Sequence, residues 1–222
     1  MSGLAAKEQP QRHGESHWPP LATVVVAIAL QVLLPDRLTA GSKWILPGLE
    51  AVMLVVLFMA SPQRLEAPHS VRRLLGLTVA AIVSIANGIS LVLLAHQLLD
   101  RNVANGHQLI VAGADIWLTN VLIFALWYWE LDRGGPGKRA EGSDGPPDFL
   151  FPQMSDDTIE PRDWRPRFID YLYVSMTNAT AFSPTDTMPL SGKAKGVMGL
   201  QALVSLVTIG LIVSRAVNIL SG

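Results

Sequence analysis

The chain has 222 residues, of which 50% are hydrophobic and only 16% are charged, and its formal net charge is -1. This much apolar surface is typical of a polytopic membrane protein and exceeds what soluble domains of this length usually carry. The near-zero net charge and the lack of a basic stripe argue against a nucleic-acid-binding protein. Because the chain has no cysteine, it has no disulfide framework, thiolate zinc site or cysteine nucleophile.

Two apolar runs follow a polar amino-terminal tail. Residues 1–18 are polar and aperiodic, which predicts a disordered tail. Residues 21–34 form a short apolar run between prolines. Its length also suits the core of a signal peptide, but we interpret it as an uncleaved first span. The second run, residues 44–60, has Pro47 and Glu50 near its start, and both are tolerable where a span meets the membrane interface.

The third span, residues 74–99, has small or polar residues along one face, among them Ser84, Asn87 and Gly88. In lipid, such a face lets two helix backbones approach closely and places Asn87 against a neighbouring helix. Close helix packing is therefore the favoured interpretation. A substrate or ion path lined by Asn87 and Ser84 is the alternative.

The fourth span, residues 109–131, contains Asp115 about 9 Å along the helix from its start. Thr119 and Asn120 follow about one turn later. An intramembrane aspartate is costly and is by default a functional candidate that faces the interior of the bundle. Two roles stay open for Asp115: structural hydrogen bonding, or an ion or proton site.

Enzymatic chemistry has little support in the sequence. An intramembrane enzyme or carrier could use Asp115 with His96 or His107, but both histidines lie near predicted helix ends. No His-x-x-x-His motif, nucleophile elbow or pair of intramembrane carboxylates occurs. We therefore expect no enzymatic activity, no cofactor and no metal site.

The fourth span closes with Trp127, Tyr128 and Trp129, which we interpret as an aromatic belt at the membrane interface. Residues 132–167 then form a hydrophilic loop whose Gly- and Pro-rich first half is expected to be flexible. Its second half regains aromatic residues and could pack on the bundle. The acids of this loop could hold a hard cation, but a solvated acidic loop fits the spacing better: Asp156, Asp157 and Glu160.

The last part of the chain, residues 168–222, carries the main functional clue. Residues 168–182 are amphipathic and would form a helix of about 22 Å, too short to cross about 30 Å of hydrocarbon. A hydroxyl-rich loop with two prolines follows at residues 183–189, and a spanning helix is predicted over 196–220. Short helix, polar loop and spanning helix is the order of a re-entrant pore loop.

A polar stripe runs along one face of that last helix. Gln201, Ser205 and Thr208 fall on one side of a helical wheel, with Arg215 near the far end. Such a stripe should face a water-filled path or a partner helix. Pore lining and ordinary packing both stay open for it, whereas Arg215 is expected to reach the headgroups.

The same stretch resembles the pore module of two-helix potassium channels, in which a short pore helix ends in a T-x-G-Y-G-D filter. Ser183-Pro184-Thr185 stands here where Gly-Tyr-Gly would be, and Asp186 matches the acid that follows the filter. Proline fixes φ and lacks an amide hydrogen, so the ion-binding carbonyl ladder is not expected. The resemblance implies a degenerate filter with these pore-loop residues: Thr177, Thr180, Ser183, Thr185, Asp186 and Thr187.

This stretch also resembles an uncharacterised family of bacterial multi-pass membrane proteins with a channel-like carboxyl-terminal end. The resemblances imply a homo-oligomer in the cytoplasmic membrane of a bacterium that conducts monovalent cations with altered selectivity. A non-conducting structural or regulatory membrane protein with a relict pore loop is the alternative. We expect an all-α polytopic bundle in four parts, with about five spanning helices and a short re-entrant pore-type helix: 1–18, 19–131, 132–167 and 168–222.

The charges predict an orientation that conflicts with the channel resemblance. With the amino terminus inside, most Lys and Arg residues fall on the cytoplasmic side, while Lys193 and Lys195 could fall on the other. The long loop is then cytoplasmic, whereas the pore loop of a potassium channel enters from outside. Three solutions stay open: an external amino terminus, a first run that does not span, or a true crossing by residues 166–189.

Overall fold

The computed structural model is mostly helical, and it describes part of the chain. Several expectations therefore lie outside the described residues: the tail over 1–17, most of the second apolar run, the pore-loop residues Ser183 and Thr185, and the acids Asp156, Asp157 and Glu160. The described residues are 18–39, 44, 48, 51–52, 55, 69–99, 106–140, 145–155, 164–180 and 186–220.

Three helices are long and apolar enough to cross a membrane, judged by length and composition within the described residues. They are α3 (His69–Leu99), α4 (Gly106–Leu131) and α7 (Gly192–Leu220). A shorter apolar helix, α1 (Trp18–Leu33), precedes them. The third, fourth and last predicted spans thus each have a helix of suitable length.

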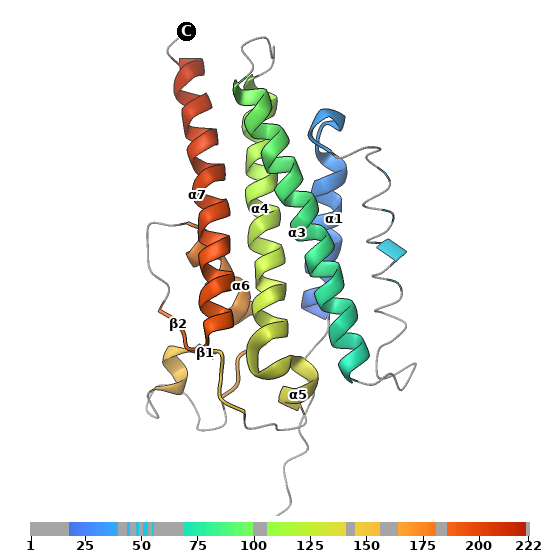
Figure 1. Ribbon diagram of the computed structural model, residues 1–222, viewed down its shortest axis with the longest axis vertical. Coiled ribbons are helices and arrows are strands. Elements are labelled where there is room, and N and C mark those ends of the chain that lie inside the picture. The colour runs from blue at the N-terminus through green and yellow to red at the C-terminus, as the bar shows by residue number, and fades with distance from the viewer. Residues whose placement is uncertain are drawn as a thin grey trace, which may run out of the picture.

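The long helices run side by side with α1, and α4 lies at the centre (Figure 1). The apolar window of α4 is 61% buried, against 44% for α3 and 22% for α7. Two apolar cores surround α4. The smaller core joins Leu94 and Leu109 to Leu38, which belongs to the short 3-10 helix η1 (Asp36–Leu38) after α1.

The larger core lies toward the carboxyl end of α4 and includes Val83, Ile123 and Val174. The predicted aromatic belt is wrong for two of its members, because Tyr128 and Trp129 are buried in this core. The cause is that residues 149–150 and 168–179 cover this end of α4, where Phe149 contacts the Tyr128 ring and Phe168 contacts the Trp129 ring.

Short elements close the end of the bundle where α4 finishes. A tight turn with left-handed backbone follows α4 in η2 (Asp132–Gly134), and α5 (Pro136–Ala140) comes next. The strand β1 (Phe149–Leu150) pairs antiparallel with β2 (Met188–Pro189), which places Phe149 opposite Pro189. Phe149 is fully buried 5.2 Å from the Tyr128 ring, so part of the predicted loop belongs to the core. The 3-10 helix η3 (Pro152–Met154) follows β1.

The predicted short helix at residues 168–182 is present as α6 (Phe168–Ala179). At its start, the amide of Arg167 donates to Asp170 Oδ2 over 2.6 Å, which satisfies a helix-end donor. Phe168 contacts Trp129 near the end of α4, with ring centroids 6.0 Å apart. At the other end of α6, Trp117 Nε1 donates to the carbonyl of Ala179 over 3.3 Å.

These contacts set the course of the chain. Trp129 lies near the carboxyl end of α4 and Trp117 near its middle, so α6 runs along about half of α4. The pairing of β2 with β1 then returns the chain to the end of the bundle where α6 began (Figure 1). Within the described residues, 168–189 therefore starts and finishes at the same end of the molecule, and α7 leaves from there.

Candidate functional site

A cluster of polar side chains, buried except for the half-buried Asn178, joins α4, α6 and α7, and we call Tyr128, Ser175, Asn178 and Gln201 the interhelical cluster. The Tyr128 hydroxyl donates to Gln201 Oε1. Asn178 Nδ2 donates to the same oxygen over 2.9 Å and to the Met198 carbonyl over 2.9 Å. The cluster thus holds the amino-terminal part of α7 against both other helices.

The other half of the Gln201 amide faces α6. Its Nε2 donates to Ser175 Oγ over 2.7 Å and to the Ser175 carbonyl over 3.0 Å. Ser175 Oγ in turn donates to the Val121 carbonyl of α4 over 2.6 Å. A buried amide costs free energy unless its donors and acceptors are paired, and here both ends of the amide are paired.

The rest of the α7 stripe is buried in the same way. Asn120 Nδ2 donates to Ser205 Oγ over 2.8 Å, and the Thr208 hydroxyl donates to the Val204 carbonyl of its own helix over 2.8 Å. Gln201, Ser205 and Thr208 all have 0% exposure. Within this chain, the stripe predicted from the sequence therefore faces α4 and α6.

The pore-loop residues that the structure describes fall into two pairs. Thr177 and Thr180 are half-buried at the carboxyl-terminal end of α6, where the Thr180 hydroxyl donates to the Thr177 carbonyl over 2.8 Å. Asp186 is exposed and Thr187 is buried, next to β2. The two pairs lie apart from each other, since α6 ends near the middle of α4 and β2 lies at the end of the bundle.

The polar residues of α3 and α4 mainly serve contacts between these helices. Asn87 is buried, and its Nδ2 donates to the Ile116 carbonyl of α4 over 3.2 Å. Ser84 accepts a 3.0 Å hydrogen bond from Trp127 Nε1. These bonds are the close packing that the sequence favoured for this face of α3.

Asp115 differs from its neighbours on α4. Thr119 and Asn120 are buried, whereas Asp115 is half-buried. His107 lies eight residues before it, about 12 Å along the helix axis, which is beyond hydrogen-bonding reach. His96 and His107 are both exposed. Among described residues, no group of three or more His, Cys, Asp or Glu side chains could hold a metal ion.

A second polar cluster, which sequence reasoning missed, joins α6 to the turn after α4. Asp132 is fully buried and accepts from the Tyr171 hydroxyl over 2.7 Å and from the amide of Asp148 over 2.9 Å. Arg139 Nη1 donates to the carbonyls of Trp129 and Asp132 over 2.8 and 2.7 Å. We call Asp132, Arg139, Asp148 and Tyr171 the turn cluster.

The sequence contains one signal for this turn cluster. Asp132 follows the last apolar residue of α4 directly, and Gly134 and Gly135 come next. Both glycines adopt positive φ, 81° and 97°, where a side chain would strain the backbone. The glycines marked a turn, but nothing local shows that the turn buries the aspartate under Tyr171.

Comparisons with known proteins give no relatives. The chain matches no protein-family model, no curated protein and no solved structure.

Proposed function

We propose that this chain is an integral membrane protein with a potassium-channel-like pore loop, and that several copies together form a path for monovalent cations. The observation that carries the proposal is the course of residues 168–189, which follow half of α4 as α6 and return to the same end at β2. In this proposal, α1 and residues 44–60 complete five crossings of the cytoplasmic membrane of a bacterium.

The end of α6 has the chemistry that such a path needs. A helix carboxyl terminus carries partial negative charge, and α6 ends beside Trp117, near the middle of α4. The hydroxyls of Thr177 and Thr180 lie at this end. One copy cannot enclose a pore, so we expect the ends of α6 from several copies to meet around one axis.

Potassium selectivity is not part of the proposal. The filter of a potassium channel needs glycines so that successive carbonyls can turn toward the ion. Ser183, Pro184 and Thr185 occupy these positions. Proline also lacks the amide hydrogen and has a fixed φ. We therefore expect cations to pass with weak discrimination.

A second candidate function is a non-conducting structural or regulatory membrane protein, and one observation favours it. Gln201, Ser205 and Thr208, which could have lined a pore, are buried inside a single chain. In both candidates these residues pack α7 against α4 and α6. The candidates differ in whether the loop after α6 lets ions through.

Ion flux in reconstituted vesicles separates the two. Purified protein in liposomes should release a monovalent-cation gradient, and Asp186→Asn should slow this release several-fold because an exposed charge beside the path is lost. Asp36→Asn is the matched control, because Asp36 is an exposed aspartate at the other end of the bundle, and it should leave flux unchanged. Vesicles that contain folded oligomer and stay ion-tight would rule out conduction and leave the second candidate.

A further inference from the structure

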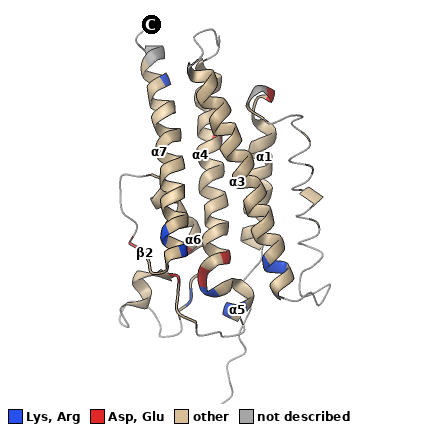
Figure 2. Ribbon diagram, in the orientation of Figure 1, with Lys and Arg blue, Asp and Glu red and all other residues tan. Residues whose placement is uncertain are grey.

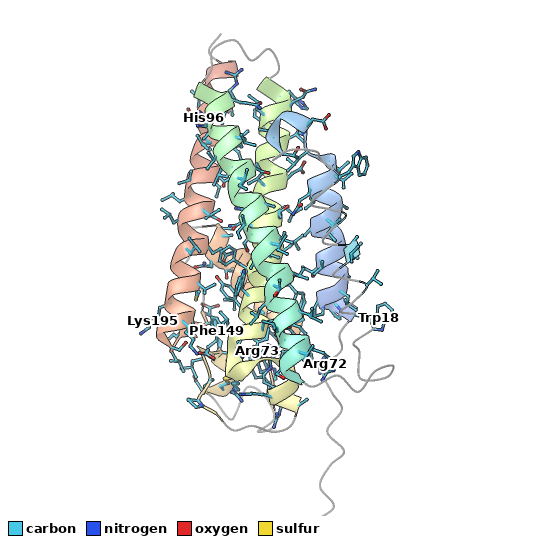
Figure 3. All side chains as sticks on the ribbon, turned by 45° about the vertical axis from the view of Figure 1, so that its right-hand side comes forward. Trp18, Arg72, Arg73, His96, Phe149 and Lys195 are labelled. Carbon is cyan, nitrogen blue, oxygen red and sulfur yellow. The ribbon has the colours of Figure 1, made fainter. Side chains whose placement is uncertain are left out.

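Positive charge gathers at one end of the bundle, which we call the basic end (Figure 2). It is the end where α3, α6 and α7 begin and where α4 finishes. Lys195, Arg72 and Arg73 lie there in Figure 3. Most Lys and Arg residues of the described chain belong to this end: Arg72, Arg73, Arg133, Lys138, Arg139, Arg165, Arg167, Lys193 and Lys195.

The opposite end carries little positive charge in the described part of the chain. Arg215 near the end of α7 belongs to it, and His96 marks it in Figure 3. Among the described residues, the asymmetry is therefore a property of the folded arrangement, with lysine and arginine concentrated at one end.

The structure corrects the expected place of two lysines. The sequence allowed Lys193 and Lys195 on the side opposite to Arg72 and Arg73, which requires residues 166–189 to cross the membrane. Because α6 and β2 return the chain to its starting end, both lysines join the basic end instead. Lysine and arginine are therefore divided more unevenly between the two ends than the sequence alone indicated.

Several of these side chains are placed to reach lipid headgroups. Lys193 and Lys195 are exposed in the first turn of α7, and Arg165 and Arg167 are exposed just before α6. Trp18 lies at the same end with 72% exposure (Figure 3). Exposed tryptophan with lysine and arginine at helix ends is the composition that proteins present to the membrane interface.

We infer that the basic end faces the cytoplasm and lies against the anionic headgroups of the inner leaflet, so that α6 and its loop enter the bilayer from the cytoplasmic side. Cytoplasmic ends of spans carry the excess of lysine and arginine, and the inner leaflet supplies the complementary negative surface. The inference rests on the proposed function only for the entry of α6 into the bilayer.

This orientation removes the conflict between the distribution of charge, which places the loop on the cytoplasmic side, and the potassium-channel resemblance, in which the loop enters from outside. None of the three earlier solutions is needed, because the loop simply enters from the side opposite to that of a potassium channel. Its mouth, near the exposed Asp186, then opens to the cytoplasm.

Cysteine labelling in this cysteine-free chain tests the orientation. Single variants Arg165→Cys, Gly192→Cys and His107→Cys place thiols at exposed positions before α6, after β2 and at the opposite end. Gly192 has no atoms within 4 Å of an added Cβ, so the new side chain fits. A membrane-impermeant maleimide should label the first two at least tenfold more in inverted bacterial vesicles than in spheroplasts, and the third in the reverse order.

The outcomes separate the inference from the proposed function. The mirror-image pattern would overturn the orientation and leave the pore loop intact. If Arg165→Cys and Gly192→Cys were labelled from opposite sides, residues between them would cross the membrane, and the proposed pore loop would fall together with the inference. Labelling of all three from one side would overturn both.

A comparison of thermal stability in two lipid compositions tests the proposed contact with anionic headgroups. In nanodiscs, replacing part of the phosphatidylcholine with phosphatidylglycerol should raise the midpoint of thermal unfolding by several degrees. The variant Lys193→Gln/Lys195→Gln should lose much of this rise, whereas Arg215→Gln, a cation removed from the opposite end, should keep it. An equal midpoint in both lipids, a full rise in the double variant, or the same rise from inorganic phosphate alone would overturn the proposed lipid contact.

Discussion

Gln201 illustrates how single residues fix the relative positions of the helices. Its side chain is fully buried, and its two amide atoms bond to residues of α4 and α6 at once. An apolar residue at this place would leave Ser175 and Asn178 with fewer partners in a buried environment, which costs about 1–3 kcal/mol for each unsatisfied group. The residue therefore specifies which face of α7 meets which neighbour.

The turn cluster gives a sharper test at the residue scale. Tyr171→Phe removes the hydroxyl that donates to the buried Asp132 and changes little else in shape. Hydrogen bonds to charged groups contribute about 1.5–3 kcal/mol, so we expect a loss of stability in that range. Thermal unfolding in detergent, followed by circular dichroism, measures it.

Tyr173→Phe is the matched control for that substitution. Tyr173 lies on the same helix and is 51% exposed, so removal of its hydroxyl should change stability by less than about 0.5 kcal/mol. Equal unfolding midpoints for the two variants would show that the bond between Tyr171 and Asp132 does not stabilise the fold.

At this scale, the sequence identified residue types better than partners. The helical spacing of Gln201, Ser205 and Thr208 correctly put them on one face. It could not say that Asn120 would meet Ser205, because residues 85 positions apart share no local pattern. The sequence places Tyr128 at the membrane interface because it follows an apolar run, whereas the cover provided by β1 and α6 explains its burial.

Close approach between helices depends on a glycine of α4. A Cβ placed on Gly113 would come within 2.6 Å of Ile212 Cγ1 on α7. Gly113→Ala should therefore force α7 away or shift Ile212, at a cost of about 1–3 kcal/mol that outweighs the gain of up to about 1 kcal/mol in helix propensity. The unfolding midpoint in detergent should fall.

Gly88→Ala provides the contrast on α3. Nothing lies within 4 Å of a Cβ at Gly88, so only the propensity gain should remain and stability should rise slightly. A Gly113→Ala variant as stable as Gly88→Ala would mean that α4 and α7 can separate without cost.

At the element scale, length and composition predicted the long helices well. The runs that became α3, α4 and α7 are continuous and apolar, so their identity follows from local sequence alone. The half-length α6 was predicted because its amphipathic segment is followed by a proline-containing loop. The face of α7 that would be covered could not be predicted, since a polar stripe suits a water-filled path and a partner helix equally.

The arrangement of the whole molecule depends on contacts that no single segment encodes. α4 is central because α1, α3, α6 and α7 all pack against it, and its apolar window is accordingly the most buried of the three spanning candidates. Periodicity shows that a helix has an interior face, but does not name its neighbour. The sorting of charge to the basic end likewise emerged only once the return of the chain at β2 placed Lys193 and Lys195.

The short ladder between β1 and β2 has a mechanical consequence. It ties the segment before α6 to the segment after it, while Tyr171 anchors the helix between them to Asp132. Because Asp132 belongs to the turn directly after α4, a displacement of α6 along its axis would have to break that bond, so α6 should keep its position along α4. A stimulus that reached the turn after α4 would thereby be transmitted to α6 without any bending of the long helices.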